Sequence, residues 1–491
     1  MNKSSSPGLG QWLFVTATVV GLIFLLYKIY QYGAFRSYLP AGLAVGGVDV
    51  GGLTLDEAGE VLNSRYVAAP VVLHHGQDTI PINPLEIEFV LDLETMLNEA
   101  DYQRSQQDFW SGFWGYLWGR PVEVEAVELR ATHNRDALLN VIEVVASRMD
   151  KPAQPPQPVP TTLSFQYGEA GTQTNANASL RDVEAAFYRP TDREAFLIVE
   201  PLEPERPDIN LLARLLVNHL QDFSGVASIF IMDLATGEEV AINADVAMSG
   251  MSIVKVPIVL ETLRALDVEP SLEQAKLISE TLVVQSGNFS ANLLLDVVAG
   301  EDNAYKGADT VTESMRRLGL VNTFIAVPYE EQPRPGRATY ETPANSHEGL
   351  LTQPDPAMQT TAEDIGTLLS MIYYCARDGS GALMAVYGNQ LTQSECQSLL
   401  GYMAQNHIGS LIEEGVPEGT TVAHKHGWIS DTHGDAGIVF SAGGDYVLVE
   451  YMYKPTWLEW EISSPLLADI ARATYNYFNF DNPYLDSSQA N

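Results

Sequence analysis

The run SIVKVPIVLETLRAL (residues 252–266) is the stretch on which the fold and chemistry of this chain depend. If Ser252 begins a helix, Lys255 lies one turn further on and on the same face. A serine hydroxyl is a weak nucleophile until a base takes its proton, and burial disfavours the charged form of a lysine that could be that base. Backbone N–H groups at a helix start can also stabilise a developing oxyanion. An S-x-x-K spacing is common by chance, so its interpretation depends on partners elsewhere.

A second polar triplet, Ser286-Gly287-Asn288, lies in the run QSGNFSANLLLDVV. Its serine could relay a proton between a lysine and a leaving amine, and its asparagine could hold a substrate amide. By itself, an S-x-N sequence usually indicates only a turn.

A third triplet, Lys425-His426-Gly427, comes immediately before a predicted hairpin in AHKHGWISDTHGDAGIVF. A lysine at this place can bind a substrate carboxylate. The glycine leaves room for substrate backbone to lie against the strand edge.

The elements around these triplets predict an α+β domain. DINLLARLLVNHL (208–220) has an apolar helical stripe, and residues 226–244 alternate as a hairpin around Gly237. A helix-rich section follows, then the strands AGIVFSA and YVLVEYMY and a last helix with Ser464 and Pro465 as N-cap and N1. This order predicts an antiparallel sheet flanked by helices, with a second helical lobe.

Together and in this order, the three motifs resemble the S-x-x-K, S-D-N and K-T-G boxes of class A β-lactamases and penicillin-binding proteins. SGNFSANLLL, including Asn292, is similar to the helix start that follows the family's second box. The resemblance covers about residues 208–480. It implies a β-lactamase/transpeptidase-like serine hydrolase domain that needs no cofactor or metal.

The resemblance also implies roles for the matched positions. The acylated nucleophile, its proton acceptor and a proton shuttle would be Ser252, Lys255 and Ser286. The substrate-binding positions would be Asn288, Asn345, Lys425, His426, Gly427 and Trp428. Asn288 would contact the substrate amide, Lys425 would anchor the carboxylate, and the backbone N–H groups of Ser252 and Trp428 would form the oxyanion hole.

Two matched positions depart from the family. Gly287 stands where the family has aspartate, which loosens a structural hydrogen bond. His426 stands where the family has threonine or serine, which places a bulky, titratable ring beside the substrate carboxylate.

The base for deacylation is the least determined part of the site. Class A enzymes use a glutamate in an E-x-x-x-N segment of the omega loop, and Glu341-Thr-Pro-Ala-Asn345 has this spacing. It precedes PAMQTTAEDIGTLLSMIY, which resembles the helix after that loop and has Thr360 and Glu363 as a capping box. The loop is long and otherwise unlike the family, so Glu341 could equally be a solvated acid, and Glu348 is a less well spaced alternative.

Outside this domain, the apolar run WLFVTATVVGLIFLLY (12–27) and its flanks reach the roughly 20 residues that a spanning helix needs. A cleaved signal peptide is the alternative, but no small-x-small site adjoins the run. Lys3 lies before the run, and Lys28 and Arg36 lie after it, so charge does not decide the orientation. Residues 1–37 are therefore predicted as a membrane anchor.

Residues 38–200 resemble the peptidoglycan-binding domain of VanW/YoaR-type surface proteins. The matching stretches are GGVDVGGLTLDEAGEVL, in which Thr54 and Glu57 form a capping box, and SLRDVEAAFYRPTDREAFLIVE. The second stretch is too small to bury a core alone, so we assign it and the preceding proline cluster (151–160) to this first domain. PLEPERP (201–207) is the predicted linker, and 481–491 is a tail.

Composition limits the alternatives. The formal net charge of −36 argues against nucleic acid as a partner and against docking onto an anionic lipid surface. The two cysteines, Cys375 and Cys396, could form one bridge or remain two buried thiols. His424, His426, Asp431 and His433 could suggest zinc, but no distant cluster completes a ligand set.

These patterns predict a single-pass membrane protein with most of the chain outside the cytoplasm, where peptidoglycan and β-lactams are met. We expect Ser252 to be acylated by a β-lactam or a D-Ala-D-Ala-like stem peptide and released by water. The alternatives are a DD-peptidase of the penicillin-binding type and a wall-binding or sensor protein that has lost turnover.

Overall fold

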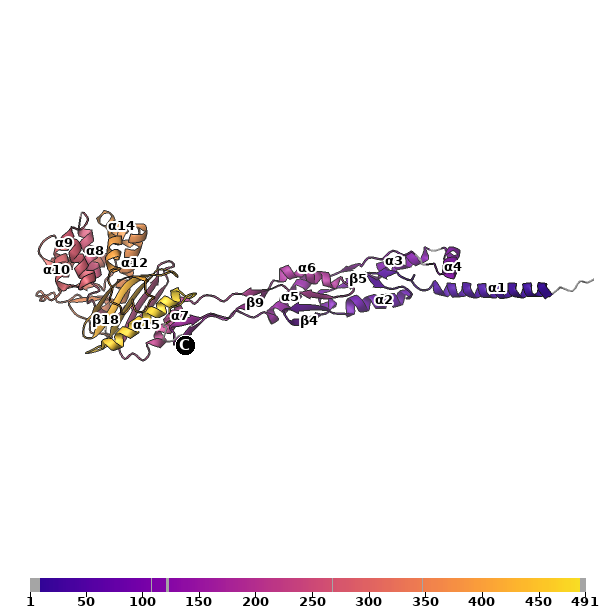
Figure 1. Cartoon of the computed structure of the whole chain (residues 1–491), viewed down its shortest axis with the longest axis horizontal. Helices are drawn as coiled ribbons and strands as arrows, with labels where there is room; N and C mark the ends of the chain where they lie inside the picture. Colours follow the sequence, from indigo (N-terminus) through magenta and orange to yellow (C-terminus); the bar gives the residue numbers. More distant parts are fainter. Residues whose placement is uncertain (1–8, 107, 121–122, 267, 347, 486–491) are drawn as a thin grey trace, which may run out of the picture. The chain divides into compact units, whose positions relative to one another are not determined.

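The computed structural model describes residues 9–106, 108–120, 123–266, 268–346 and 348–485 of the 491-residue chain. The chain divides into two compact units, Met1–Gln154 with Glu169–Glu203 and Pro155–Gly168 with Pro204–Asn491. The predicted α+β class is confirmed, and both units contain helices as well as strands (Figure 1).

The first unit begins with the helix α1 (Leu9–Phe35), which is long and apolar enough to cross a membrane. The most apolar 18-residue stretch of this helix is not buried against the rest of the protein. A signal sequence would pass the same test. The other helices of the unit are α2 (Leu55–Asn63), α3 (Leu93–Ser105), α4 (Phe109–Leu117), α5 (Arg135–Met149) and α6 (Ala176–Phe187).

Short strands complete the first unit: β1 (Ala44–Val45), β2 (Val48–Asp49), β3 (Val71–His75), β4 (Asp78–Ile82), β5 (Val90–Leu91), β6 (Ala131–Thr132), β9 (Gly171–Thr174), β10 (Glu194–Phe196) and β11 (Val199–Leu202). β10 pairs in parallel with β3, so the end of the unit returns to its beginning. The predicted capping box at α2 is confirmed, because Glu57 N donates to Thr54 Oγ1 and Thr54 N donates to Glu57 Oε2.

A hairpin of β7 (Gln157–Val159) and β8 (Ser164–Gln166) belongs to the second unit, whereas the sequence predicts the whole proline cluster (151–160) in the first domain; residues 151–154 do lie in the first unit. Leu163 and Phe165 are buried in a core that includes Leu211 and Leu467. The apolar side chains of this hairpin therefore find their partners about 50 residues and 300 residues further along the chain, which local sequence cannot show.

The second unit is built on a five-stranded antiparallel sheet in the order β13-β12-β19-β18-β17. The strands are β12 (Val226–Asp233), β13 (Glu239–Ile242), β17 (Thr421–Trp428), β18 (Thr432–Phe440) and β19 (Tyr446–Tyr453). Successive residues face opposite sides, so Ile229 and Ile231 enter one core while Phe230 enters the other.

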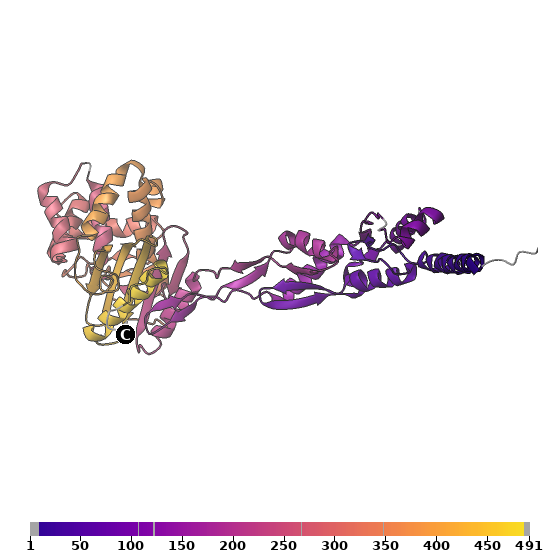
Figure 2. The same cartoon turned by 45° about the vertical axis from the view of Figure 1, so that its right-hand side comes forward.

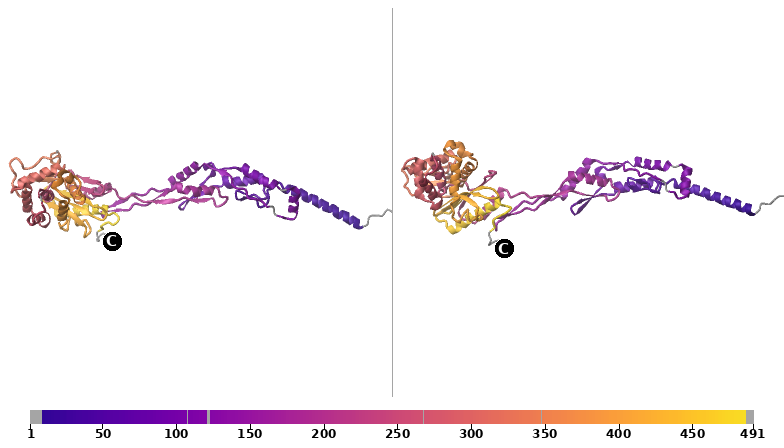
Figure 3. Two further views of the ribbon diagram at one scale, coloured as in Figure 1. Left: turned by 90° about the horizontal axis from the view of Figure 1, so that it is seen from above. Right: turned by 45° about the horizontal axis from the view of Figure 1, so that its top comes forward.

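Helices cover both faces of this sheet. α7 (Ile209–His219) and α15 (Trp460–Phe478) pack on one face, and α12 (Ala362–Asp378) packs on the other (Figures 1 and 2). The orange helices and the yellow C-terminal helix lie on opposite sides of the strands in Figure 3. The predicted sheet with flanking helices is therefore present.

The helical lobe lies on the α12 side. Its helices are α8 (Lys255–Ala265), α9 (Leu272–Ser279), α10 (Asn288–Ala299), α11 (Ala304–Arg317), α13 (Ala382–Tyr387) and α14 (Gln393–Met403). A small sheet of β14 (Met248–Ser249), β16 (Met358–Thr360) and β15 (Phe324–Ile325) joins the lobe to the rest. α8 is buried all round from Lys255 to Leu263, as expected for a helix at the centre of a domain.

Two predicted helix starts are wrong. α12 is capped by Thr361, whose hydroxyl accepts from Asp364 N, because Thr360 ends β16 and its hydroxyl bonds to Thr323. α15 begins at Trp460, and Pro465 lies inside it. The extra turn is held by Trp460, whose ring contacts His433 at a centroid distance of 5.4 Å.

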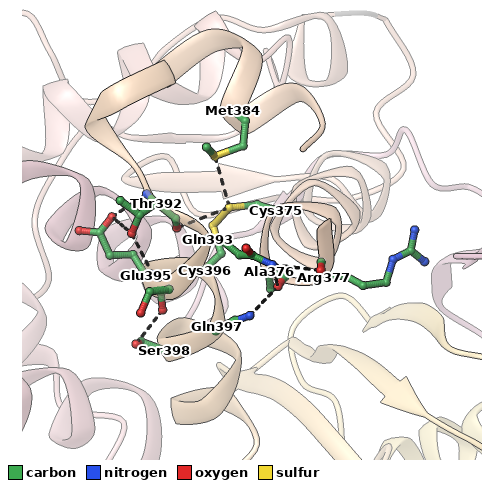
Figure 4. Close-up of a disulfide and its surroundings, with 11 residues drawn as sticks. Cys375, Ala376, Arg377, Met384, Thr392, Gln393, Glu395, Cys396, Gln397 and Ser398 are labelled. Atoms are coloured by element: carbon green, nitrogen blue, oxygen red, sulfur yellow. Dashed lines mark hydrogen bonds between the residues drawn. A yellow bond between two sulfur atoms is a disulfide. The ribbon is translucent and has the colours of Figure 1, made fainter. Parts of the chain in front are cut away.

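Cys375 of α12 and Cys396 of α14 form a disulfide between two neighbouring helices of the lobe (Figure 4). Thr392 caps α14, since its hydroxyl accepts from Glu395 N and its own N–H bonds to the Glu395 carboxylate. Gln397 donates to the Ala376 carbonyl, which adds a second link between the helices. The bridge closes a loop with a sequence separation of 21 residues.

We expect the double variant Cys375→Ala/Cys396→Ala to lose about 3 kcal/mol of unfolding free energy, because a bridge over a loop of this length restricts the unfolded chain. Urea unfolding followed by circular dichroism measures this loss. Wild type in reducing agent should show a similar loss, and the double variant should not respond to the reductant. Equal stability of the oxidised and reduced wild type would contradict the prediction.

Candidate active site

The three sequence motifs, S-x-x-K, S-G-N and K-H-G, meet in the second unit. Ser252 lies in the turn between β14 and α8, and Lys255 is the first residue of α8. Ser286 and Asn288 lie at the start of α10, and Lys425 lies on the edge strand β17. Lys255 N donates to Ser252 O and Val256 N donates to Ile253 O, and these turn bonds place the serine at the N-terminus of α8, as the sequence predicts.

Lys255 is the centre of the site. Its side chain has 0% exposure, and its Nζ donates to Ser252 Oγ at 3.0 Å and to Asn288 Oδ1 at 2.8 Å. Nζ also donates to the Ser286 carbonyl and lies 3.4 Å from Ser286 Oγ. These contacts bring Ser252, Lys255, Ser286 and Asn288 together in one constellation.

Burial, which is the largest cause, and the positive charge of Lys425 together lower the pKa of Lys255 to about 7, while the Glu330 carboxylate opposes the shift. A large fraction of the Lys255 side chains is therefore neutral at physiological pH. A neutral amine 3.0 Å from a serine hydroxyl can accept its proton.

Gly287 fits its position because the neighbouring side chain takes the space of a Cβ. A Cβ at this glycine would lie 2.5 Å from Ser290 Oγ. Ser290 Oγ in turn accepts from Thr281 Oγ1 at 2.9 Å and donates to the Gly287 carbonyl. The Ser290 hydroxyl therefore supports this turn where the family has an aspartate at position 287.

Tyr329 and Glu330, which no sequence pattern predicts as site residues, contact Lys255 and Asn288. The buried Tyr329 places its ring 4.7 Å from Lys255 Nζ, and its hydroxyl donates to the Met251 carbonyl at 2.7 Å. Asn292 bonds to both the N–H and the carbonyl of Tyr329. Asn292 in the SANLLL run is the sequence signal that could point to this segment, because its side-chain amide needs hydrogen-bond partners.

Glu330 has a left-handed backbone with φ +61° and accepts from Asn288 Nδ2 at 2.8 Å. Asn288 therefore uses its oxygen for Lys255 and its amide for Glu330. No sequence motif marks Glu330, which is one of several acids in its loop.

The end of β17 lies against the nucleophile turn. A Cβ at Gly427 would lie 2.9 Å from Ser252 N and 2.8 Å from Met251 Cβ, so only glycine lets the strand come this close. Ile429 N donates to Thr432 O, so Ile429 and Thr432 are a hydrogen-bonded pair at the end of the β17–β18 hairpin. Bonded and non-bonded pairs alternate along an antiparallel ladder, so the next pair, Trp428 and His433, is non-bonded. The Trp428 N–H consequently points to the free edge beside Ser252 N, where the predicted oxyanion hole requires two donors.

Lys425 is buried, and its Nζ donates to the His426 carbonyl at 2.9 Å. Burial lowers the pKa of Lys425 to about 8, partly offset by Asp435, so it is mostly charged at pH 7. Burial and Lys425 together lower the pKa of His426 to about 4. Asn406 Nδ2 lies 3.4 Å from His426 Nδ1, so the neutral ring accepts there and keeps its proton on Nε2.

The histidines proposed as zinc ligands have other partners. His424 Nδ1 bonds to the buried Asp435 carboxylate at 2.8 Å, and His433 Nδ1 bonds to Ser463 Oγ at 2.5 Å. Across the described parts of the chain, no group of three or more His, Cys, Asp or Glu side chains is placed to hold a metal ion.

Glu341 and Asn345 lie in the long loop before β16. Asn345 donates to the Tyr340 carbonyl and to Gln359 Oε1, and it accepts from Thr342 N, so its amide organises the loop itself. Glu341 is exposed, and within the described residues no hydrogen bond links it to Ser252 or Lys255. The structure does not join these two residues to the constellation around Lys255.

A cavity of about 740 Å³ opens beyond the end of β17. His426 and Trp428 form one side of it, and Trp457 and Trp460 form another. Substrate held at the strand edge would reach this apolar space past His426.

Comparison with known proteins gives three results. The sequence model described as "Beta-lactamase enzyme family" matches residues 211–276 and 274–478, which is more than half of the chain. A search of curated proteins found no match.

Solved structures that are similar to this chain include a mutant of PBP-A as an acyl-enzyme complex with penicillin G, with 21% identity and a TM-score of 0.43. The match covers 57% of this chain and 100% of that chain. The crystal structure of a β-lactamase from Sphaerobacter thermophilus DSM 20745 has 18% identity and a TM-score of 0.42, again over 57% of this chain and 100% of that chain.

Proposed function

We propose a function for this chain from the premise that it belongs to the beta-lactamase enzyme family. Its second unit acts as a serine hydrolase in which Ser252 is acylated by a β-lactam or a D-Ala-D-Ala-like peptide, and water then releases the product. The observation that carries this proposal is the buried Lys255 amine, with its pKa lowered to about 7, at 3.0 Å from Ser252 Oγ.

In the first step, neutral Lys255 takes the Ser252 proton while Oγ attacks the substrate carbonyl carbon. The negative charge that develops on the carbonyl oxygen is stabilised by the N–H groups of Ser252 and Trp428. Loss of one such donor typically costs about 100- to 1,000-fold in rate. The C–N bond then breaks, and Ser286, whose Oγ lies 3.4 Å from Lys255 Nζ, relays the proton to the leaving nitrogen.

The remaining residues hold the substrate. Charged Lys425 attracts its carboxylate, and His426 offers a neutral Nε2–H to the same group in place of the family's hydroxyl. Asn288 already bridges Lys255 and Glu330, so its contact with a substrate amide needs one of these bonds to give way. Gly427 keeps the strand edge close to Ser252.

Deacylation needs a base that activates water. The E-x-x-x-N spacing favours Glu341, with Asn345 beside it, whereas the contact with Asn288 favours Glu330. The exposed position of Glu341 is the observation that supports a second candidate function, a penicillin-binding protein or DD-peptidase with a long-lived acyl-enzyme, or a sensor without turnover.

The location of the substrate agrees with the rest of the chain. Peptidoglycan and β-lactams are met outside the cytoplasmic membrane, and α1 can anchor the chain there as a single span. The proposal therefore places the bulk of the chain outside the cytoplasm, with the first unit as a peptidoglycan-binding module on the strength of its VanW/YoaR-type stretches.

The central test is mass spectrometry of the full chain in detergent after exposure to penicillin G. We expect a mass increase on Ser252 in wild type and none in Ser252→Ala. Rapid return to free enzyme with hydrolysed drug indicates a lactamase, and a persistent adduct indicates a penicillin-binding protein. A folded wild type that never forms the adduct contradicts an acylating enzyme and leaves a binding module.

The pH dependence of the acylation rate is a further prediction. The pKa of Lys255 is lowered to about 7, so its neutral form accumulates as the pH rises, and the rate constant should increase up to tenfold per unit below pH 7. Above about pH 8, Lys425 loses its charge and carboxylate binding weakens. Stopped-flow measurements with a chromogenic cephalosporin should therefore show a maximum between pH 7 and 8, and a rate independent of pH from 5.5 to 7 would refute the role of Lys255.

Glu341→Gln should lengthen the lifetime of the adduct about 100-fold or more while leaving the acylation rate nearly unchanged, because it removes only the base for water. Glu330→Gln is the matched variant. If Glu330 is the base, the Glu330→Gln variant traps the adduct and the Glu341→Gln variant does not. An unchanged lifetime in Glu341→Gln removes that residue from the mechanism.

A further inference from the structure

α4 exposes a stripe of tryptophans on the first unit. Trp110, Trp114 and Trp118, the C-cap residue, are four residues apart and so lie on one face of the helix. Their exposed fractions are 57%, 51% and 73%. Single exposed apolar residues are normal, but three indoles along one face form a surface that water solvates poorly.

The opposite face of α4 packs on the last turns of α1. The ring of Tyr32 is buried between Phe109, Phe113 and Tyr116 at centroid distances of 5.4, 5.7 and 5.4 Å. Phe35 adds a contact with Tyr116 at 5.1 Å. α4 is therefore fixed to the end of the apolar helix within one compact unit (Figure 1).

The length of α1 determines the depth in the bilayer at which the contact between α1 and α4 lies. Its 27 residues extend about 40 Å, and the hydrocarbon core of a bilayer needs about 20 of them. The residues that touch α4, from Lys28 to Arg36, form the last turns and follow the uninterrupted apolar run. When α1 spans the bilayer, these turns and α4 lie at the depth of the headgroups.

A cavity of about 620 Å³ adjoins α4 and is lined by Arg36, Arg104 and Arg120. Arg104 Nη1 donates to the Arg36 carbonyl at 3.0 Å, which ties α3 to the end of α1. Arg104 also pairs with Asp101 at 2.6 Å, and Asp108 is the one acidic residue among the described residues of the lining, so arginines outnumber acids there in a chain with 27 basic and 63 acidic residues. Guanidinium groups suit phosphate oxygens, which every phospholipid headgroup carries.

We propose that α4 is a second membrane contact, in which the tryptophan stripe lies in the interface of a zwitterionic phospholipid bilayer and the arginine-lined cavity faces its phosphates. Tryptophan prefers this depth because its ring is apolar and its N–H remains hydrated. The inference rests on the proposed membrane localisation and adds that the first unit is held against the bilayer surface by α1 and α4 together.

The test is fluorescence quenching of the full chain in nanodiscs of phosphatidylcholine brominated at carbons 6 and 7 of one acyl chain. We expect strong quenching in wild type, of which Trp110→Phe/Trp114→Phe/Trp118→Phe removes the larger part, leaving the share of Trp12 in α1. The matched control Trp457→Phe/Trp460→Phe, in the second unit, should leave the quenched intensity unchanged. Bromines at carbons 11 and 12 should quench the stripe less, because it lies near the headgroups.

A triple variant that loses as much intensity to the bromines as wild type would overturn the α4 contact while leaving the anchor intact. Absence of quenching from Trp12 as well would overturn the anchor and the α4 contact together, and the acyl adduct on Ser252 would still report on the hydrolase independently. Each single Trp→Phe variant should remove part of the quenched intensity. Because these single changes are conservative, they retain the test if the triple variant unfolds.

Discussion

The removal of the Lys255 amine from water is the constraint on which the second unit depends. A buried ammonium without compensation is costly, so the amine is surrounded by oxygen acceptors from Ser252, Ser286 and Asn288 and by the ring face of Tyr329. These partners come from the nucleophile turn, the start of α10 and the segment after β15. The fold must therefore bring three distant segments together to keep one lysine buried, and in the proposed mechanism the same arrangement activates the serine.

The strand edge of β17 contributes backbone groups to the site as well as the side chains of Lys425 and His426. Gly427 allows β17 to approach Ser252 N at a distance that a Cβ would prevent, and the hairpin register turns the Trp428 N–H toward the open edge. An oxyanion hole formed in this way has donors that are fixed before substrate arrives, so no reorganisation is needed when charge develops. The sheet and the central helix are thus coupled at one glycine.

The sequence predicted those features that depend on short spacing and failed where distant packing decides. Ser252 and Lys255 meet because one helical turn separates them, and the α2 capping box forms for the same local reason. Tyr329 and Glu330 were missed, since they reach the site through a left-handed bend that follows a two-residue strand. The start of α15 was misplaced because Pro465 is a sound local signal, but Trp460 finds a tertiary partner one turn earlier.

The proposed mechanism needs its base, Lys255, and its carboxylate anchor, Lys425, in different protonation states. Both pKa values are lowered chiefly by burial, but Lys255 also feels the charge of Lys425, whereas Lys425 is supported by Asp435. A bound carboxylate would favour the charged form of Lys425, and the expulsion of water by the same substrate would further disfavour a charge on Lys255. Substrate binding would therefore widen the difference between the two pKa values, and part of this difference exists before substrate binds. The polar neighbours of Lys255, rather than the S-x-x-K spacing itself, support Ser252 as the proposed nucleophile.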